Sequence, residues 1–420
     1  MQILIEKSEI KGQVQSPSSK SYTIRSLMCA ALARGQSEIR NPLSSDDTEA
    51  ALRVLRKIGV QVATDGDRWL VNGGLFQNPC EDLFCGDSAA TLRFMSAICA
   101  LVPGRSRLTA GPSLSKRPVI TLVQALQRWG VDISSQGDTA PVIVNNGGRF
   151  SGGLTELPGD ISSQYISALL LIASLAMGNT LIRLTSPLES RSYVLMTLEC
   201  LERFGIKVKY TDELMEYETV RQEYQPAKVN IEGDWSSASY LLGLGAVGGE
   251  IKVGNINIQS MQGDRVILDI LKKMGAGVEE AEGFIIVRKS QLKAIQADLK
   301  ECIDLLPTLA VLAALAEGTS VFTGIQRASL KESNRVKTVK DGLKRAGIRV
   351  IEEIDKLTIQ GGQPTPAEID SYNDHRIAMS FSLLGIASGG ITIKGAECVS
   401  KTYPEYWNTL RSLGVKMHEQ

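Results

Sequence analysis

A pentad near residue 331 carries residue types that bind anions and move protons. It reads KESNR, so Lys331, Glu332 and Arg335 fall within five positions at the expected start of a helix. Lysine and arginine bind carboxylate and phosphate, and a carboxyl group can act as a general acid or base. Charges three or four residues apart also form ordinary solvent-exposed helix faces. The spacing therefore supports either anion chemistry or a solvated surface.

Asp304 lies 27 residues upstream, in the segment IDLLPT between an expected strand and an expected apolar helix. A carboxylate in that position is either a helix N-cap or a general base. The segment YNDHR, residues 372–376, opens another apolar helix with a histidine between an aspartate and an arginine. Lys401, in KTYPEYW, fits an anion ligand or a surface lysine equally well. These segments hold the candidate functional side chains of the C-terminal half.

Polar residues precede each apolar segment that predicts a helix. These starts read SPSSKSYTIR, CGDSAATLR, GDISSQY, EGDWSSASY, IDLLPT and YNDHR. Serine, threonine and aspartate accept hydrogen bonds from free backbone N–H groups at helix starts, and for GDWSSASY we expect nothing more. In the others they alternate with side chains that bind anions: Lys20, Arg25, Arg93, Gln164, His375 and Arg376. Helix N-termini favour negative charge, so if the repeats pack as equivalents and several of these starts converge, we expect a ligand with more than one anionic group.

Two series of glycines show how these segments are organised. Apolar helical segments end at Gly35, Gly104, Gly178, Gly248, Gly318 and Gly389, and amphipathic ones end at Gly59, Gly130, Gly205, Gly275, Gly347 and Gly414. Both series repeat about every 70 residues, which predicts six equivalent units. We expect each glycine to adopt the left-handed conformation that ends a helix.

Each unit would contain two helices and several strands. The first helix is apolar nearly all round and must be buried, whereas the second is amphipathic. The 420 residues are enough for two or three domains, and with only 5% aromatic residues the cores must be built mainly from small aliphatic side chains. This pattern predicts an α/β or α+β protein with helices buried among sheets.

Composition excludes several classes of protein. The 46 basic and 46 acidic side chains cancel, which argues against nucleic-acid binding. The two histidines leave little material for a histidine metal site, and the longest apolar run, residues 165–177, is too short to span a membrane. Seven cysteines without a C-x-x-C pair, and no signal peptide, favour a reducing cytoplasmic location.

Seven motifs together resemble the 5-enolpyruvylshikimate-3-phosphate synthase (EPSP synthase) family. They run in order from Ser16 to Trp407 and read SPSSKSYTIR, GDSAATLR, SKRP, SSQYISALL, KESNR, YNDHR and SKTYPEYW. The resemblance implies a two-domain inside-out α/β barrel with six βαβαββ-type units, three per domain, around buried parallel helices. It implies that domain 1 comprises residues 1–15 and 232–420 and domain 2 residues 16–231, with crossovers near 16–20 and 230–234.

The resemblance also implies a reaction. The family transfers the enolpyruvyl group of phosphoenolpyruvate to the 5-hydroxyl of shikimate 3-phosphate through a tetrahedral intermediate and releases phosphate. This is a step of the shikimate pathway, and it uses no metal or organic cofactor. The implied catalytic residues are Asp304 as base, Glu332 as acid, Lys331 and Lys20. We expect a cytoplasmic monomer whose partners are small molecules rather than nucleic acid or membrane.

The family's binding residues carry over position by position. Domain 2 is the shikimate 3-phosphate side and domain 1 the phosphoenolpyruvate side, where Asp304, Lys331 and Glu332 lie. For shikimate 3-phosphate the implied residues are Lys20, Ser21, Arg25, Ser162, Ser163, Gln164, Ser190, Tyr193, Asp304 and Lys331. For phosphoenolpyruvate they are Lys20, Ala89, Arg117, Gln164, Arg335, Arg376 and Lys401. The cations exceed the carboxylates and match two polyanions, and His375 is expected to orient its neighbours.

One loop departs from the family. It usually reads G-N-x-G-T, but here it is Gly86-Asp87-Ser88-Ala89-Ala90. Asp87 should repel the phosphate of phosphoenolpyruvate unless a cation such as Arg93 pairs with it. Ala89 replaces the glycine against which the inhibitor glyphosate lies, so we expect weak inhibition.

Two other functions stay open. UDP-N-acetylglucosamine enolpyruvyl transferases share the fold but usually have a cysteine in the loop matching residues 113–118, and an asparagine after the first lysine. Here the loop reads SLSKRP, and Ser21 follows Lys20. A non-catalytic anion-binding protein on the same fold would be expected to lack an acid, a base or a cation.

Overall fold

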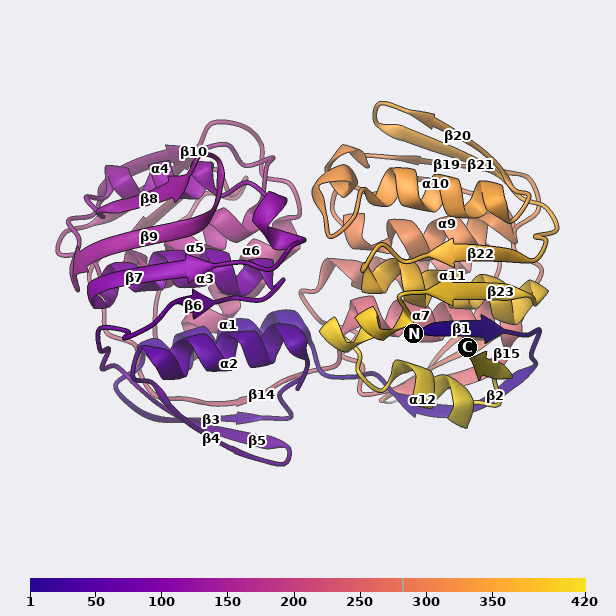
Figure 1. Ribbon diagram of the computed structural model, residues 1–420, viewed down its shortest axis with the longest axis horizontal. Helices are drawn as coiled ribbons and strands as arrows, with labels where there is room; N and C mark the ends of the chain where they lie inside the picture. The colour runs from indigo at the N-terminus through magenta and orange to yellow at the C-terminus, as the bar shows by residue number, and fades with distance from the viewer. Residues whose placement is uncertain (282) are drawn as a thin grey trace. The chain divides into compact units, whose positions relative to one another are not determined.

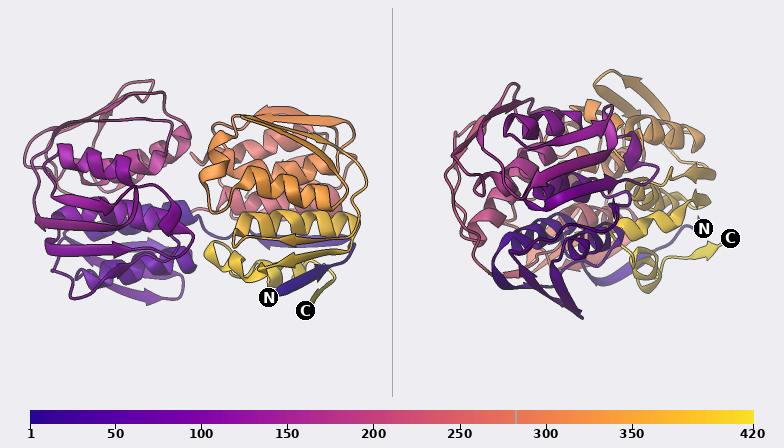
Figure 2. Two further views of the ribbon diagram at one scale, coloured as in Figure 1. Left: turned by 45° about the horizontal axis from the view of Figure 1, so that its top comes forward. Right: turned by 60° about the vertical axis from the view of Figure 1, so that its left-hand side comes forward.

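The computed structural model describes residues 1–281 and 283–420. The chain forms two compact units, which are described separately. Unit 1 comprises Met1–Pro17 and Glu232–Gln420, and unit 2 comprises Ser18–Ile231. Figures 1 and 2 show that helices lie among sheets in each unit.

The described strands of unit 2 form three four-stranded sheets. One has the order β14 (Lys228–Asn230), β3 (Gly35–Arg40), β5 (Arg68–Gly73), β4 (Gln61–Asp65). A second has the order β6 (Leu83–Phe84), β7 (Pro103–Thr109), β9 (Thr139–Gly147), β8 (Ile133–Gln136). The last has the order β10 (Gly153–Leu157), β11 (Thr180–Leu184), β13 (Glu216–Thr219), β12 (Lys209–Tyr210).

Unit 1 repeats this arrangement in the part of the chain that the structure describes. Its sheets have the orders β2 (Ile10–Gln15), β15 (Gly249–Gly254), β17 (Phe284–Arg288), β16 (Gly277–Ala281), and β18 (Gln296–Asp298), β19 (Thr319–Thr323), β21 (Lys356–Gln360), β20 (Arg349–Glu353). The remaining sheet has the order β22 (Ala367–Asp370), β23 (Ile391–Lys394), β1 (Gln2–Ile5), β24 (Met417–Glu419).

Every one of these sheets has the same pairing. A parallel pair at one edge is followed by two antiparallel pairs, for example β14 with β3, β3 with β5 and β5 with β4. In the last sheet of unit 1 the two ends of the chain supply the antiparallel partners, since β1 pairs with both β23 and β24. The six units expected from the glycine period are thus confirmed over the described residues, with one unit completed by the N-terminal strand.

The helices fall into the two predicted kinds. Nearly every residue is buried in α1 (Lys20–Leu32), α3 (Ala89–Ile98), α5 (Ser163–Ala173), α7 (Trp235–Gly248), α9 (Leu306–Ala314) and α11 (His375–Ser388). One face is buried in α2 (Asp46–Lys57), α4 (Ile120–Arg128), α6 (Arg191–Arg203), α8 (Ile267–Lys273), α10 (Arg335–Arg345) and α12 (Tyr406–Ser412).

Short 3₁₀ helices connect several of these elements. They are η1 (Cys99–Leu101), η2 (Leu114–Lys116), η3 (Gly263–Val266), η4 (Ile303–Leu305), η5 (Gln326–Leu330) and η6 (Ala396–Lys401). Some of them carry candidate functional residues, because η4 contains Asp304 and η6 ends at Lys401.

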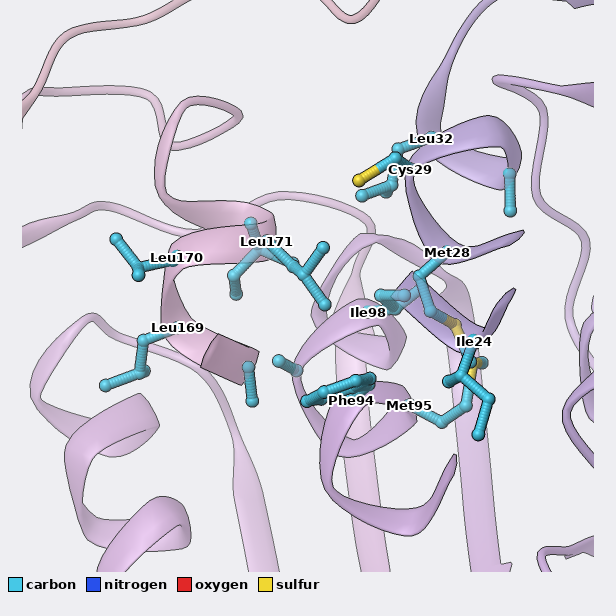
Figure 3. Packing of buried hydrophobic residues seen from close by; sticks show 14 of the residues in the cluster. Ile24, Met28, Cys29, Leu32, Phe94, Met95, Ile98, Leu169, Leu170 and Leu171 are labelled. Atoms are coloured by element: carbon cyan, nitrogen blue, oxygen red, sulfur yellow. The ribbon is translucent and has the colours of Figure 1, made fainter. Parts of the chain in front are cut away.

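The buried helices pack against one another to form the core of each unit. In unit 2, Figure 3 shows side chains of α1, α3 and α5 gathered together, including Met28, Phe94 and Leu171. In unit 1, α11 contacts both α7 and α9. Packing of helices that are apolar on all sides leaves their polar N-termini as the places where functional side chains can gather. No helix among the described residues combines the length and apolar character that crossing a membrane requires.

The amphipathic helices end in a shared hydrogen-bonded turn. After α2, the N–H of Gly59 donates to the carbonyl of Arg56 and that of Val60 to the carbonyl of Leu55, each at 3.1 Å. This pair of bonds is the Schellman motif, which requires a left-handed residue. It recurs at Gly130, Gly205, Gly275, Gly347 and Gly414, each with positive φ. The prediction is confirmed for this series.

In the other glycine series the left-handed prediction is wrong at Gly178 and Gly248, neither of which has positive φ. At Gly248 the reason for glycine is close packing, because a Cβ atom there would lie 3.0 Å from the Ile10 side chain and 3.1 Å from Ile386. The other four members, Gly35, Gly104, Gly318 and Gly389, have φ between 84° and 114°.

Candidate active site

In unit 1, the starts of three helices bring together an arginine–carboxylate cluster, comprising Asp304, Glu332, Arg335, Asp374 and Arg376. Asp304 comes from η4, which leads into α9, and Glu332 and Arg335 lie at the start of α10. Asp374 is the N-cap of α11 and accepts a hydrogen bond from the N–H of Arg376 at 3.0 Å. The side chain of Asp304 is 10% exposed.

Asp304 is surrounded by cations. Its carboxylate lies 2.6 Å from Nη1 of Arg335, 3.2 Å from Nζ of Lys331 and 3.5 Å from Nη2 of Arg376. The N-terminus of α9 has no side-chain cap, so the N-cap interpretation of Asp304 is wrong. Opposite charges at these distances favour an ionised carboxylate, which is the form a general base needs.

Arg335 holds three carboxylates with its guanidinium group. Nε donates to Asp374 at 2.8 Å, Nη1 to Asp304 at 2.6 Å and Nη2 to Glu332 at 2.5 Å. Although burial lowers the pKa of Arg335, the charges of Asp374, Glu332 and Asp304 raise it above its usual value. The arginine is 99% buried, so the hypothesis of a solvated helix face is wrong for this residue of the KESNR pentad.

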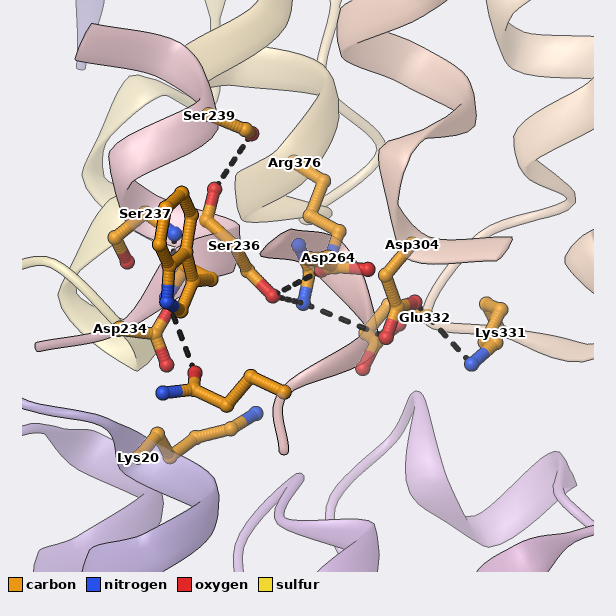
Figure 4. Close-up of polar contacts among 12 residues, drawn as sticks. Lys20, Asp234, Ser236, Ser237, Ser239, Asp264, Asp304, Lys331, Glu332 and Arg376 are labelled. Carbon is orange, nitrogen blue, oxygen red and sulfur yellow. Dashed lines mark hydrogen bonds and ion pairs between the residues drawn. The ribbon is translucent and has the colours of Figure 1, made fainter. Parts of the chain in front are cut away.

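Arg376 connects this cluster to two residues that sequence analysis did not select. Its guanidinium donates to Oγ of Ser236 at 3.2 Å and to the hydroxyl of Tyr240 at 3.4 Å. Ser236 in turn donates to the buried carboxylate of Asp264 (Figure 4). In the GDWSSASY segment the cap expectation is confirmed for Asp234, which accepts from the N–H of Ser237 at 2.7 Å, but it is wrong for Ser236.

Two lysines complete the predicted residues of unit 1. The pKa of Lys331 is lowered, mainly because burial disfavours the charged ammonium, while the nearby Asp304 opposes this effect. Lys401 is 92% buried and donates to the carbonyl of Asn373 at 2.7 Å, so it is not a surface lysine. His375, the first residue of α11, is also buried.

The pH dependence of stability is expected to change in Asp264→Asn. Burial, and then the charge of Asp304, raise the pKa of Asp264 from 3.8 to about 7. Between these values the folded protein binds a proton that the unfolded chain does not. The stabilising contribution is therefore complete below pH 4 and is lost as the pH rises through 7. In the wild-type protein this titration should make the free energy of unfolding fall with rising pH, by up to about 1.4 kcal/mol per pH unit. In Asp264→Asn this fall should disappear.

Urea unfolding between pH 4.5 and 8 measures this slope. Asp269→Asn is a matched control, because Asp269 lies on the exposed face of α8. The control should keep the wild-type slope. An Asp264→Asn curve parallel to wild type would show that Asp264 titrates normally.

In unit 2, the start of α1 carries two of the predicted cations. Lys20 pairs with Asp47 at 3.0 Å. Arg25 donates to Oγ1 of Thr197 at 2.8 Å and to the carbonyls of Ser21 and Tyr193, both at 3.1 Å. Its guanidinium also lies 5.7 Å from the centre of the Tyr193 ring. Burial is the main cause of a lowered pKa at Arg25.

A second arginine organises the start of α5. Nη1 of Arg93 donates to Gln164 at 2.7 Å and to Ser162 at 3.2 Å, and its guanidinium lies over the ring of Tyr165. Asp87 does not take Arg93 as its partner. Its carboxylate instead accepts from backbone N–H groups in the loop at residues 113–114. Arg93 belongs to the GDSAATLR motif, but nothing in the sequence predicted its partners.

The other predicted residues of unit 2 lie at element ends. Ser162 and Ser163 start α5, Ala89 is the first residue of α3, and Arg117 follows η2. Ser190, at the start of α6, has φ 54° and ψ 50°. That left-handed conformation is unfavourable for serine, and such strain is concentrated at functional sites.

The described part of unit 1 thus joins Asp304, Lys331, Glu332, Arg335 and Arg376 through direct contacts. In unit 2 the contacts form separate groups around Lys20, Arg25 and Arg93. Among the described residues, no group of three or more histidine, cysteine, aspartate or glutamate side chains is arranged to hold a metal ion. All seven cysteines have free thiols.

Repeated mixed sheets around buried helices define the enolpyruvyl transferase fold. The chain superimposes on the enolpyruvyl transferase NikO from Streptomyces tendae with a TM-score of 0.81 at 18% identity, over 100% of this chain and 98% of the other. It superimposes on EPSP synthase from Acinetobacter baumannii with a TM-score of 0.84 at 29% identity, over 100% of both chains. The expected inside-out α/β fold is confirmed.

The sequence comparisons identify the family. The model of EPSP synthase (3-phosphoshikimate 1-carboxyvinyltransferase) matches residues 5–410. The chain is 47% identical over 419 residues to the 3-phosphoshikimate 1-carboxyvinyltransferase of Dehalococcoides mccartyi, covering 99% of both chains. It is 39% identical over 424 residues to that of Methanothermobacter thermautotrophicus, covering 100% of both.

The chain belongs to the EPSP synthase family. It is a 3-phosphoshikimate 1-carboxyvinyltransferase that performs the EPSP synthase reaction of the shikimate pathway, as the resemblance implied. The match favours this function over UDP-N-acetylglucosamine enolpyruvyl transfer and over a non-catalytic anion-binding role.

Proposed function

We propose that the enzyme uses phosphoenolpyruvate and shikimate 3-phosphate as substrates and that the arginine–carboxylate cluster of unit 1 transfers the protons. The observation that carries this assignment is the ring of cations around the Asp304 carboxylate, at 2.6 to 3.5 Å. An ionised, nearly buried carboxylate is a suitable base toward the 5-hydroxyl of shikimate 3-phosphate. Lys331, which has a lowered pKa and lies beside Asp304, would contact the same hydroxyl.

Glu332 would supply the proton to the methylene of phosphoenolpyruvate. Arg335 holds one of the Glu332 oxygens. The Glu332 side chain is 18% exposed, compared with 10% for the Asp304 side chain. Two carboxyl groups in different surroundings can serve as base and acid of one reaction. Arg335 would therefore arrange both groups in addition to binding phosphoenolpyruvate. Lys20 would take part in catalysis from unit 2.

The remaining predicted cations would bind phosphoenolpyruvate. Arg376 and Lys401 in unit 1 are buried, where a charge acts more strongly on an anion than it does in water. Each substrate carries a carboxylate and a phosphate, which arginine binds through paired N–H groups. The proposed ligands of phosphoenolpyruvate are Lys20, Ala89, Arg117, Gln164, Arg335, Arg376 and Lys401.

Shikimate 3-phosphate would bind mainly through unit 2. Serines at the starts of α5 and α6 suit its phosphate, because helix N-termini have free N–H groups and a favourable dipole. Arg25 would bind its carboxylate. The proposed ligands are Lys20, Ser21, Arg25, Ser162, Ser163, Gln164, Ser190 and Tyr193, with Asp304 and Lys331 from unit 1. Residues 16–231 would thus form the shikimate 3-phosphate domain, and residues 1–15 with 232–420 the phosphoenolpyruvate domain, of a cytoplasmic monomer.

Release of phosphate from phosphoenolpyruvate tests the choice of substrates. We expect release in the presence of shikimate 3-phosphate and none when UDP-N-acetylglucosamine replaces it. Titration calorimetry with shikimate 3-phosphate measures binding in the same preparation. Binding without phosphate release would contradict the proposal.

Glyphosate should inhibit the wild-type enzyme weakly, and Ala89→Gly should increase sensitivity. Ala89 is 93% buried at the start of α3, so its methyl group would crowd an inhibitor slightly longer than phosphoenolpyruvate. Removing one methyl group from a packed site typically changes affinity about tenfold or more. Inhibition constants for glyphosate, with the KM for phosphoenolpyruvate alongside, measure this. Potent inhibition of the unmodified enzyme would refute it.

A further inference from the structure

A carboxylate in unit 2 holds the loop that carries Arg117. Oδ1 of Asp87, in the turn before α3, accepts hydrogen bonds from the N–H groups of Ser113 and Leu114, each at 3.0 Å. A single oxygen therefore binds two consecutive backbone donors, and hydrogen bonds to a charged acceptor are stronger than neutral ones. Asp87 thus fixes the start of η2.

The same hydrogen-bonded turn continues to Arg117. The carbonyl of Leu114, whose N–H Asp87 holds, accepts from the N–H of Arg117 at 3.0 Å. The loop also lies directly against the turn that carries Asp87, because the N–H of Gly111 donates to the carbonyl of Gly86 at 2.7 Å. A Cβ atom at Gly111 would lie only 2.6 Å from Oδ1 of Asp87. The close contact between the turn and the loop therefore requires glycine.

The loop is also held on the far side of Arg117. The carbonyl of Pro118 accepts from the hydroxyl of Tyr165 at 2.5 Å and from Nη2 of Arg93 at 3.5 Å. Arg117 therefore lies between two attached points, one made by Asp87 and one made by Tyr165 and Arg93. Removing either attachment would let its backbone move.

We propose that Asp87 is a positioning residue for phosphoenolpyruvate binding, which acts by fixing the loop at residues 113–117 so that Arg117 is presented to the substrate. The inference rests on the proposed role of Arg117. The oxygen that accepts the two hydrogen bonds carries this function, so an uncharged acceptor in the same place should keep most of it. The observed contacts therefore favour positioning over simple repulsion of phosphate.

Kinetics of Asp87→Ala and Asp87→Asn separate these two effects. Alanine removes the acceptor, and we expect the KM for phosphoenolpyruvate to rise about tenfold or more, because two hydrogen bonds to a charged group are lost. The KM for shikimate 3-phosphate should change by less than about twofold. Asparagine keeps an acceptor oxygen of the same geometry and should restore most of the loss. An asparagine variant as impaired as alanine, or an alanine variant with unchanged KM, would overturn the proposal.

Hydrogen exchange of the substrate-free enzyme reports on the loop independently of its role in binding. Amides at 113–117 should exchange faster in Asp87→Ala and at the wild-type rate in Asp87→Asn. Unchanged exchange in Asp87→Ala would overturn this inference and would leave the proposed role of Arg117 unaffected. If the loop loosens but Arg117→Ala leaves the KM for phosphoenolpyruvate unchanged, the proposed role of Arg117 fails and the inference fails with it.

Asp82→Ala provides a matched control in the same unit. Asp82 forms an exposed ion pair with Arg107, and an exposed pair contributes little. Neither the KM for phosphoenolpyruvate nor exchange at 113–117 should change in this variant. A change equal to that of Asp87→Ala would show that loss of any nearby carboxylate suffices, and would overturn the proposal.

Discussion

Asp304→Ala is expected to lower kcat by about 10²- to 10⁴-fold, the contribution that a positioned general base typically makes. The carboxylate lies among Lys331, Arg335 and Arg376 at 2.6 to 3.5 Å, and alanine offers no proton acceptor in its place. Affinity for shikimate 3-phosphate should fall much less, because most of its proposed ligands are in unit 2. Phosphate release and titration calorimetry measure the two quantities separately.

Asp298→Asn is the control for this experiment. Asp298 is an exposed carboxylate at the end of β18, six residues before Asp304, and asparagine keeps its hydrogen bond to the N–H of Lys300. Turnover in the control should match wild type. Retained turnover in Asp304→Ala would mean that another group is the base.

Arg335→Leu is expected to reduce the free energy of unfolding by about 3 to 5 kcal/mol, as removal of one partner from a buried ion pair typically does. Arg335 is 99% buried and pairs with Asp304, Glu332 and Asp374, the last of which is fully buried. Without the arginine these carboxylates would repel one another in a largely buried site, where water screens charge less than at the surface. Urea unfolding followed by circular dichroism measures the loss.

Arg288→Ala provides the comparison, because Arg288 also binds two carboxylates, Glu250 and Glu279, but with 46% of its side chain exposed. Exposed pairs contribute about 0 to 1 kcal/mol, so this variant should unfold close to wild type. Equal losses in the two variants would contradict the idea that burial makes the Arg335 contacts important.

The repeat architecture could be predicted from sequence because it depends on a backbone conformation that few residues adopt. Each Schellman turn needs a left-handed residue, so glycine recurs at Gly59, Gly130 and their equivalents with the period of the fold. Gly178 and Gly248 occupy the same sequence pattern without positive φ, so the pattern alone does not separate conformational from packing reasons for glycine. The role of β1 in completing a sheet with β23 and β24 depends on pairing between residues 386 to 416 positions apart, which no local signal encodes.

The candidate site was only partly predictable for a related reason. Residue type and motif identified Asp304, Arg335 and Arg376, which the structure joins in one cluster. Ser236 and Asp264 were not predicted as site residues, because each resembles an ordinary helix-start residue and their contact joins positions 28 residues apart. Likewise, Asp87 was expected to need a cation, whereas backbone N–H groups satisfy it. Candidate catalytic and binding residues can be identified from the sequence. Their partners depend on how helix starts that are distant in the sequence pack together.

A crystal structure with shikimate 3-phosphate and a phosphonate analogue of phosphoenolpyruvate would test the site assignment most directly. We expect the 5-hydroxyl to lie about 2.6 to 3.2 Å from the Asp304 carboxylate, the reach of a general base. We also expect the 3-phosphate to contact Ser162, Ser163 and Ser190. A 5-hydroxyl out of reach of both Asp304 and Lys331 would show that neither residue acts on it.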